Sequence, residues 1–238
     1  MNFSPVSVPY IFNEIYDSSV FFVRNKQQFT LYLLECLFLP VFRCCSESEL
    51  HQERHVLFMS YCDYCKQPEA KLVHQQYHNQ TYGFRTVDDN ELFGRLILEI
   101  NQAGLSWETI LNKEQNFRDA YSNFDIDKVS NYGDKERQRL LLDAGIVRNK
   151  LKINAAIYNA QQIVILKNEF GSFIRWLDMN HPLSIEEWVR LFKKTFKFVG
   201  GKIVSEFLMS TGYIPGAHNE NCPIFVEVLK TKPKWKEV

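Results

Sequence analysis

The chain has 238 residues, of which 45% are hydrophobic, so it can bury a substantial core in one large domain or two small ones. Lys and Arg together number 28, as do Asp and Glu, and the formal net charge is zero. Whole-chain charge therefore argues mildly against a nucleic-acid partner, and any polyanion must be bound by a local basic patch. The six cysteines, at positions 36, 44, 45, 62, 65 and 222, are too few and too unevenly spaced for the disulfide framework of a small secreted protein. Reduced thiols or metal ligands fit better.

Residues 1–58 differ in character from the rest of the chain. The most apolar run, Phe29–Phe42, has 14 residues interrupted by a glutamate and a proline, which is shorter than the ~20 apolar residues of a membrane span. Met1–Phe22 has no Lys or Arg, which argues against a signal peptide and export. Because Met59 directly precedes SYCDYCKQPEA, we expect 1–58 to be a leader outside the functional core. We expect 59–238 to form the functional domain of a cytoplasmic protein.

Between positions 88 and 124 the apolar residues follow helical spacing. In the first run they recur at three- and four-residue steps, with Asp88 or Asp89 as N-cap and Gly104 as the end. Ser106 is placed to cap a short helix, and a further helix is expected over Glu114–Phe124. The positions expected to form one buried face are Leu92, Phe93, Leu96, Ile97 and Ile100.

The second half of the chain continues this pattern. Helices are expected over Gly133–Ala144 and Arg148–Phe170, with a short turn at Gly145 between them. Ser184–Glu187 has the sequence SIEE, a capping box that opens another helix. The segment VGGKIVSEFLMSTG predicts a last helix that ends at Gly212. No segment alternates apolar and polar residues as a strand does, so the sequence predicts an all-α fold.

Cysteine and histidine residues near both ends of this core have spacings typical of a metal site. Cys65 and His78 are 13 residues apart, and His218 and Cys222 form an H-x3-C pair. Zinc prefers four thiolate and imidazole ligands in tetrahedral geometry, and such a set would tie the start of the core to its end. Cys62 is a competing ligand, because C-x2-C is itself a common zinc half-site. The alternative is a set of small buried cysteines and surface histidines with no common partner.

The segment LLLDAGIVRNKLKINAAIYNA, Leu140–Ala160, predicts a tight helical hairpin with basic residues just after the turn. The backbone N–H groups and the dipole at the start of its second helix favour a phosphate, which would give a sequence-independent grip on a nucleic-acid backbone. A solvated helix end is the alternative. A second basic patch in KKTFKFVGGK contains no acidic residue, and two such patches could offset the neutral whole-chain charge. The first cluster comprises Arg148, Lys150 and Lys152, and the second comprises Lys193, Lys194, Lys197 and Lys202.

Four segments in this order, YHNQTYG, NQAGLSW, DAGIVRNKLKI and FKFVGG, resemble those of the DNA-3-methyladenine glycosylase I family of base-excision repair enzymes. The resemblance covers roughly Tyr61–Cys222. It implies an all-α helix-hairpin-helix fold, one structural zinc ion per chain, and a hairpin that contacts the DNA backbone. The implied zinc ligands are Cys65, His78, His218 and Cys222, and the implied backbone contacts are Gly145, Val147, Arg148 and Lys150.

The same resemblance places Glu99, Trp107 and Tyr77 in a base-recognition pocket, with Glu99 as the catalytic residue. His74 stands where the family usually has an aromatic residue, three positions before that tyrosine, so we include it among the base-binding residues. A second departure is the segment NQTYG, where the family usually has Asp-x-Glu-Trp-Gly. These departures concern the pocket wall and not the class of protein.

The expected reaction is hydrolytic release of N3-methyladenine from alkylated double-stranded DNA, after the damaged nucleotide has been flipped out of the duplex. The methylated base is cationic, so Trp107 can stack on its face while the carboxylate of Glu99 accepts hydrogen bonds from its edge. From Ala144 to Leu177 the chain has no Asp, so no strong general base is expected, and no lysine is placed for a Schiff-base lyase.

Two other functions remain open at this point. One is a non-catalytic, zinc-stapled DNA-binding module, and the other is a glycosylase of altered substrate range in which His74 supplies a hydrogen-bond donor. In each case we expect a monomer that has alkylated DNA or DNA as its partner and does not bind a membrane.

Overall fold

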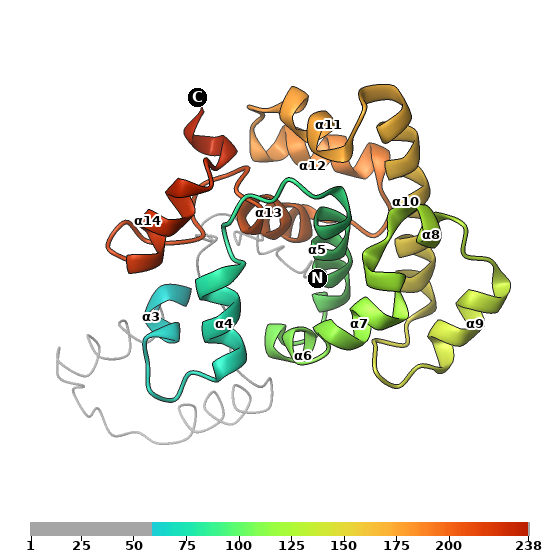
Figure 1. Cartoon of the computed structure of the whole chain (residues 1–238), viewed down its shortest axis with the longest axis horizontal. Coiled ribbons are helices and arrows are strands. Elements are labelled where there is room, and N and C mark those ends of the chain that lie inside the picture. Colours follow the sequence, from blue (N-terminus) through green and yellow to red (C-terminus); the bar gives the residue numbers. More distant parts are fainter. Residues whose placement is uncertain (1–58, 238) are drawn as a thin grey trace, which may run out of the picture. The chain divides into compact units, whose positions relative to one another are not determined.

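A computed structural model describes residues 59–237, and every regular element in this part of the chain is a helix (Figure 1). The all-α prediction is confirmed. The expected leader at 1–58 lies outside the described residues and stays a prediction. The elements are α3 (Tyr61–Cys65), α4 (Leu72–Gln80), α5 (Asp89–Gln102), α6 (Trp107–Leu111), α7 (Glu114–Ala120), η1 (Ser122–Phe124), α8 (Ile126–Ser130), α9 (Asp134–Leu142), α10 (Lys150–Phe170), α11 (Phe173–Asn180), α12 (Ile185–Thr195), α13 (Gly201–Ser210), α14 (Pro223–Lys230) and η2 (Lys234–Lys236).

Helix α5 lies in the middle of the bundle and packs against α6, α7, α8, α10, α11 and α13. Its first turn is capped by Asp88, whose side chain accepts a hydrogen bond from the backbone N–H of Asn90 at 2.8 Å. The five positions predicted to form its buried face are each at most 1% exposed, which confirms that prediction. The helix ends at Gln102, and Gly104 follows with a φ of +84°, a conformation that glycine adopts without strain.

Gly94 allows the turn η1 to pack directly on α5. A Cβ atom at this position would lie 2.2 Å from the ring of Phe124, so any larger residue would displace the ring. The sequence predicted one helix over Glu114–Phe124, and this is wrong in its last part. Helix α7 ends at Ala120, and the three residues of η1 have positive φ angles, which reverses the chain and brings Phe124 onto α5.

The long helix α10 packs against α8, α9 and α11. Its predicted start at Arg148 is two residues early, because Asn149 caps the helix by accepting two backbone hydrogen bonds at 2.9 and 3.2 Å. Helices α8 and α11 were not predicted. Helix α11 is fixed by Asp89, whose carboxylate accepts hydrogen bonds from its first two N–H groups at 3.0 and 2.9 Å. One aspartate therefore belongs to the first turn of α5 and caps α11.

The capping box predicted at the start of α12 is confirmed. The backbone N–H of Ser184 donates to the Glu187 carboxylate at 2.9 Å, and the N–H of Glu187 donates to the Ser184 hydroxyl at 3.3 Å. Helix α12 packs on α13, and α13 packs on α5. Among the described residues, none of the helices combines the length and the apolar character that crossing a bilayer requires.

Candidate functional site

Two cysteines and two histidines from opposite ends of the described chain meet in one buried group. Their four ligand atoms lie within 4.8 Å of one another. The Sγ of Cys222 is 3.7 Å from Nε2 of His78 and 3.8 Å from Nδ1 of His218, and the Sγ of Cys62 is 3.6 Å from the latter nitrogen. A tetrahedral zinc ion with ordinary bond lengths separates its sulfur and nitrogen ligands by about 3.3–3.8 Å. The group thus has the size and the donors to hold a metal ion.

This group corrects one of the predicted ligands. His78, His218 and Cys222 belong to it, but Cys62 takes the place that the sequence analysis assigned to Cys65. Both cysteines lie on the short helix α3, and the thiol of Cys65 is instead directed at α4, with its Sγ 3.7 Å from the backbone oxygen of His74. Which thiol reaches the other three ligands depends on how α3 packs against α4, and the spacing of residues along the chain does not contain that information.

Hydrogen bonds on the far side of each imidazole turn a lone pair toward the two sulfur atoms. His218 donates from Nε2 to the backbone oxygen of Tyr82 at 2.7 Å, and His78 donates from Nδ1 to the side-chain oxygen of Asn79 at 2.7 Å. The other nitrogen of each ring is then free to bind a metal. Burial lowers the pKa of both histidines, that of His218 to about 4, so both rings are neutral at pH 7 and suited to metal binding.

A second candidate site is centred on Glu99 in α5. Glu99 is 6% exposed, and no hydrogen-bond donor reaches its carboxylate within the part of the chain that the structure describes. Burial raises the pKa of Glu99 well above its usual range, and the carboxylate of Glu206 adds to this effect, whereas Lys202 and Arg95 oppose it. Burying an ionised carboxylate without a partner is costly, so this position suits a ligand that brings positive charge or hydrogen-bond donors.

Tyr77 lies next to both Glu99 and Trp107. Its ring centroid is 5.1 Å from that of Trp107, at an angle of 66°, and the nearby charge of Glu99 helps to raise the pKa of the buried Tyr77 hydroxyl. Trp107 follows Ser106, which caps α6 as predicted by accepting a hydrogen bond from the N–H of Thr109 at 3.2 Å. The indole N–H of Trp107 is buried and has no hydrogen-bond partner among residues 59–237. A buried donor without a partner, the indole N–H of Trp107, and the carboxylate of the buried residue Glu99 thus lie on either side of Tyr77.

His74 has protein partners at both ring nitrogens. Its Nδ1 is 3.0 Å from the hydroxyl of Tyr61 on α3, and its Nε2 is 3.9 Å from the carboxylate of Glu108 on α6. The residue is 5% exposed. In this arrangement His74 joins α3 to α6 through α4, and its predicted contact with a bound base stays a prediction.

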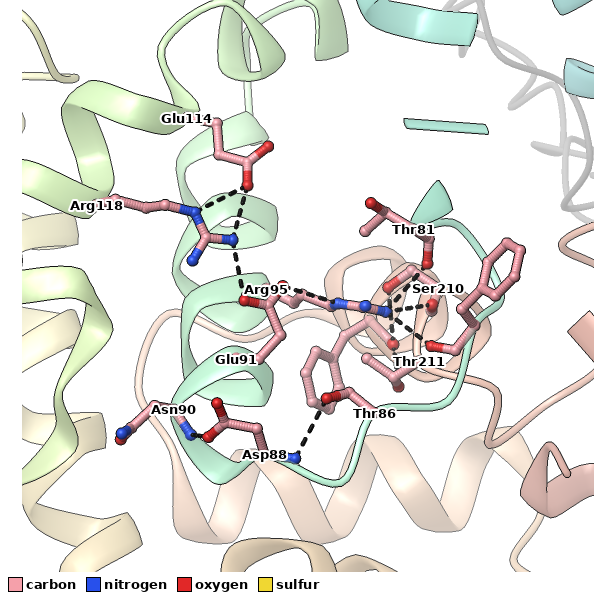
Figure 2. Close-up of polar contacts among 12 residues, drawn as sticks. Thr81, Thr86, Asp88, Asn90, Glu91, Arg95, Glu114, Arg118, Ser210 and Thr211 are labelled. Atoms are coloured by element: carbon pink, nitrogen blue, oxygen red, sulfur yellow. Dashed lines mark hydrogen bonds and ion pairs between the residues drawn. The ribbon is translucent and has the colours of Figure 1, made fainter. Parts of the chain in front are cut away.

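Arg95, one turn before Glu99 on α5, holds three segments of the chain together (Figure 2). Its side chain is 10% exposed, and one guanidinium nitrogen donates to three backbone oxygens. Its Nε donates to Glu91 at 3.4 Å, and Glu91 also accepts from Arg118 at 2.9 Å. The loop after α4 and the end of α13 are therefore held against the part of α5 that carries Glu99. The three backbone oxygens belong to Thr81, Phe84 and Ser210, at 3.2, 3.0 and 2.8 Å.

We expect Arg95→Met to lower the free energy of unfolding by about 2–4 kcal/mol, because it removes charge-assisted hydrogen bonds to backbone oxygens. Urea unfolding followed by circular dichroism measures this change. Arg137→Met is the matched control, since Arg137 pairs with the fully exposed carboxylate of Asp134 and its loss should change the free energy by less than about 0.5 kcal/mol. Equal effects of the two substitutions would contradict the role assigned to Arg95.

The predicted hairpin is formed by α9, a turn and α10. Ile146 is buried and anchors the turn in the core, whereas Arg148 and Lys150 are exposed. The turn is held in place by Lys113, whose ammonium donates to the backbone oxygen of Gly145 at 2.9 Å. The start of α10 therefore presents two basic side chains to solvent at the positive end of a long helix.

Lys152, which the sequence analysis placed in the same basic cluster, is directed into the protein. It is 4% exposed, and its ammonium donates to the backbone oxygens of Asn101 and Ala103 at 2.9 and 2.7 Å. It satisfies carbonyl groups at the C-terminal end of α5. The prediction that Lys152 contributes to an exposed basic cluster is therefore wrong.

The sequence analysis did not single out Glu206 or Arg95. Glu206 lies in the apolar helical run IVSEFLM, and a carboxylate within such a run is a signal that could have found it. Arg95 offers no comparable signal, because two of the three backbone oxygens that it binds lie outside its own helix in the preceding loop and the third lies 115 positions further along the chain.

Comparison with known proteins connects the chain to one family. Residues 67–190 match the family described as methyladenine glycosylase. The chain is 32% identical over 157 residues to DNA-3-methyladenine glycosylase 1 of Escherichia coli (strain K12), a match that covers 58% of this chain and 84% of that protein. It is 26% identical over 179 residues to the DNA-3-methyladenine glycosylase of Haemophilus influenzae, with 67% of this chain and 96% of that protein covered.

Solved structures give the same result. A structure of 3-methyladenine DNA glycosylase I from Staphylococcus aureus, which concerns 3-methyladenine recognition, superposes with a TM-score of 0.63 at 27% identity and covers 69% of this chain and 97% of its own. A tyrosine-to-phenylalanine variant of 3-methyladenine DNA glycosylase I in complex with 3-methyladenine gives a TM-score of 0.62 at 27% identity, covering 68% of this chain and 97% of its own. The chain belongs to the methyladenine glycosylase family, as its motifs predict.

Proposed function

We propose that this protein is a monofunctional DNA glycosylase that hydrolytically releases N3-methyladenine from alkylated DNA in base-excision repair. The observation that carries the proposal is the site around Tyr77, where the carboxylate of Glu99 lacks a donor and the indole N–H of Trp107 lacks an acceptor within the described chain. The matched relatives support the class of reaction, since they are named as DNA-3-methyladenine glycosylases.

The charge of the substrate accounts for its selection. A base within a duplex is out of reach, so the enzyme extrudes the damaged nucleotide and holds it in the site, at a cost of a few kcal/mol. As a nucleotide, N3-methyladenine is cationic, so it can stack on the face of Trp107 and compensate the charge of Glu99. Normal adenine is neutral and would leave the buried carboxylate of Glu99 without compensation. Discrimination against the undamaged base follows from that difference.

The positive charge of the substrate also makes the glycosidic bond easier to break. An alkylated, cationic base is already a good leaving group, and the segment from Ala144 to Leu177 contains no aspartate that could act as a strong general base. Catalysis therefore rests on orienting the nucleotide for attack by water and on electrostatic stabilisation of positive charge on the sugar. Glu99 is the residue that supplies the negative charge and touches the base.

Two solved neighbours, one of them already described, support the choice of Tyr77 and Glu99. One is the tyrosine variant bound to 3-methyladenine, and the other is a glutamate-to-glutamine variant of the Staphylococcus aureus enzyme, at 28% identity and a TM-score of 0.59. By the numbering that these variants carry, the substituted tyrosine and glutamate are separated by as many positions as Tyr77 and Glu99.

Contact with DNA is assigned to the hairpin. Exposed Arg148 and Lys150 lie at the start of α10, and the backbone N–H groups of Gly145 and Val147 belong to the turn that precedes it. The N–H of Gly145 donates to the carboxylate of Asp143 at 2.7 Å and must exchange that partner to bind a phosphate. Phosphate oxygens accept hydrogen bonds from such groups irrespective of sequence, so this contact positions the duplex and the site around Glu99 selects the base.

Zinc is the ion that best suits the group of Cys62, His78, His218 and Cys222, with one ion per chain. Two thiolates and two imidazoles at tetrahedral distances are ligands that zinc prefers. With four protein ligands no position is open for water, so the ion is structural. His78 directly follows Tyr77 on α4, so the ion also fixes the helix that carries a residue of the base site.

The proposed function is tested by incubating the full-length protein with methylated DNA and separating the released bases by chromatography. We expect release of N3-methyladenine far above its spontaneous loss and no release of adenine from unmethylated DNA. A folded, zinc-loaded protein that binds DNA but frees no base would instead identify a non-catalytic DNA-binding module. Release of other alkylated bases at similar rates would show an altered substrate range.

A further inference from the structure

Glu206 on α13 is a partly buried carboxyl group that has no role in the metal site or in the scheme proposed above. Helix α13 packs against α5. Arg95 of α5 binds the backbone oxygen of Ser210 at 2.8 Å (Figure 2), near the end of α13. Glu99, one turn further along α5, interacts with Glu206, one turn back along α13. Two successive turns of α5 thus meet two successive turns of α13, which places Glu206 next to Glu99 at the contact of the two helices.

Groups from each neighbouring element face this pair. The hydroxyl of Tyr82, in the loop after α4, donates to Met209 Sδ at 3.2 Å, and hydrogen bonding from the same hydroxyl lowers the pKa of Glu206. The single proton of the Tyr82 hydroxyl therefore has two possible acceptors, Met209 Sδ and the carboxylate of Glu206. Lys202 lies one turn before Glu206 on α13 and its side chain is on the exposed side of the helix. The titratable or charged groups around the pair are Tyr77 from α4, Tyr82 from the loop, Arg95 from α5 and Lys202 from α13.

The two carboxyl groups cannot both ionise without compensation. Burial raises the pKa of each, and the charge of Glu206 raises that of Glu99 further, whereas Lys202 lowers both. Arg95 contributes less, because its guanidinium is already engaged by Glu91 and three backbone oxygens. When both carboxylates are ionised, the pair carries two negative charges. Lys202 balances one of them, and no second full positive charge balances the other. A cationic base supplies one charge of that sign, and a neutral base supplies none.

We propose that Glu206 is a further specificity-determining residue of the base site, which lies opposite Glu99 at the contact of α5 and α13 and forms with it an acidic pair that favours a cationic purine. This inference rests on the proposed function. In this arrangement Lys202 sets the charge of the pair from its exposed end, and Tyr82 links the pair to the ring of Tyr77, 5.5 Å from its own.

The test compares the full-length protein with Glu206→Gln and Lys202→Met in release of N3-methyladenine, between about pH 5 and pH 9. We expect Glu206→Gln to lower kcat/KM by about 5-fold at neutral pH, because the site loses negative charge. The acid limb of its pH profile should move to lower pH, because Glu99 then ionises without a neighbouring charge. Lys202→Met should move the same limb to higher pH. A merely structural role for Glu206 does not produce opposite shifts in the two variants.

Inhibition by free bases measures the specificity at acidic pH, because 3-methyladenine is neutral once it has left the sugar and becomes cationic again only when it is protonated. The ratio of the inhibition constants of adenine and 3-methyladenine should fall in Glu206→Gln by about the same factor as kcat/KM. Glu227→Gln is the matched control, because Glu227 is an exposed glutamate on α14 paired with Lys230, and it should leave the rate, the pH profile and the ratio unchanged. Thermal unfolding verifies that each variant is folded. Glu206→Asp keeps the negative charge and should therefore retain the wild-type ratio of the two inhibition constants.

The inference and the proposed function fail in different ways. Release of N3-methyladenine by the wild-type protein together with unchanged values in Glu206→Gln overturns the inference alone. Absence of release by the wild-type protein overturns the proposed function, and calorimetric binding of 3-methyladenine, at acidic pH where the free base is protonated, then decides the inference. Weaker binding to Glu206→Gln, with opposite pH shifts in the two variants, supports the acidic pair, and identical binding overturns it.

Discussion

Replacing Cys62 or Cys222 by Ser is expected to remove the zinc ion and to lower the thermal unfolding midpoint by about 10 °C or more. Apparent binding energies of structural zinc are about 10–16 kcal/mol in small peptides, and 1 kcal/mol corresponds to about 2–4 °C in a domain of 150–250 residues. The proposed ion would join α3 and α4 to the segment before α14, between residues 156 positions apart. Its loss therefore separates both ends of the described chain and loosens the helix that carries Tyr77.

Cys65→Ser is the matched control for this prediction. Cys65 lies on the same helix as Cys62 and undergoes the same chemical change, but its thiol is 3.7 Å from the backbone oxygen of His74 and outside the ligand group. Elemental analysis should find one zinc per chain in wild type and in Cys65→Ser, and none in Cys62→Ser or Cys222→Ser. Zinc retained by Cys62→Ser but lost by Cys65→Ser would restore the ligand set predicted from sequence spacing.

The helices that hold the site were predictable where local signals are strong. The periodic face of α5, the glycine that follows it, and the caps at Ser106 and Ser184 are all formed. Each depends on residues within one or two turns of each other. Helix α11 was missed although Ser172 is a local N-cap that accepts a hydrogen bond from the N–H of Arg175 at 2.9 Å. Its second cap, Asp89, lies 84 positions before the first residue of α11. Such a cap leaves no local mark in the sequence.

The residues of the site were also predictable only in part. Glu99 and its neighbours in the base site, Tyr77 and Trp107, followed from the resemblance to a family. The choice between Cys62 and Cys65, the inward direction of Lys152 and the facing position of Glu206 depend on how helices pack. Periodicity predicts which side of a helix is buried, but it does not predict which helix covers that side or in what register.

Glu99→Gln is expected to reduce kcat/KM for N3-methyladenine release by about 100-fold or more. Truncating or neutralising one partner of a buried, hydrogen-bonded charge pair typically costs about 2–5 kcal/mol, and each 1.4 kcal/mol is about a factor of ten. The amide keeps the shape of the side chain but has no charge for the cationic base, and half of its polar surface is a donor. Single-turnover kinetics with methylated DNA measures the loss. Glu227→Gln, the same change on the exposed side of α14, should leave the rate unaltered.

The same substitution is expected to stabilise the protein, and the size of this effect should depend on pH. Burial raises the pKa of Glu99 in the folded state above the usual value of 4.5, so the folded state holds the proton more tightly than the unfolded state. The resulting stability is fully present below about pH 4.5 and is lost as pH rises through the folded-state pKa. Glutamine has no proton to lose.

The difference in unfolding midpoint between Glu99→Gln and wild type should therefore be small at about pH 4.5, increase as the pH rises, and level off once Glu99 is ionised in both states. Each pKa unit of the shift is worth about 1.4 kcal/mol, or about 2–4 °C in a domain of this size. Thermal unfolding at a series of pH values measures this difference. A variant that is inactive and also less stable at neutral pH would show that Glu99 supports the fold. A variant that is inactive and more stable would show that the carboxylate of Glu99 destabilises the fold. Its role would then be to bind the positive charge of the substrate.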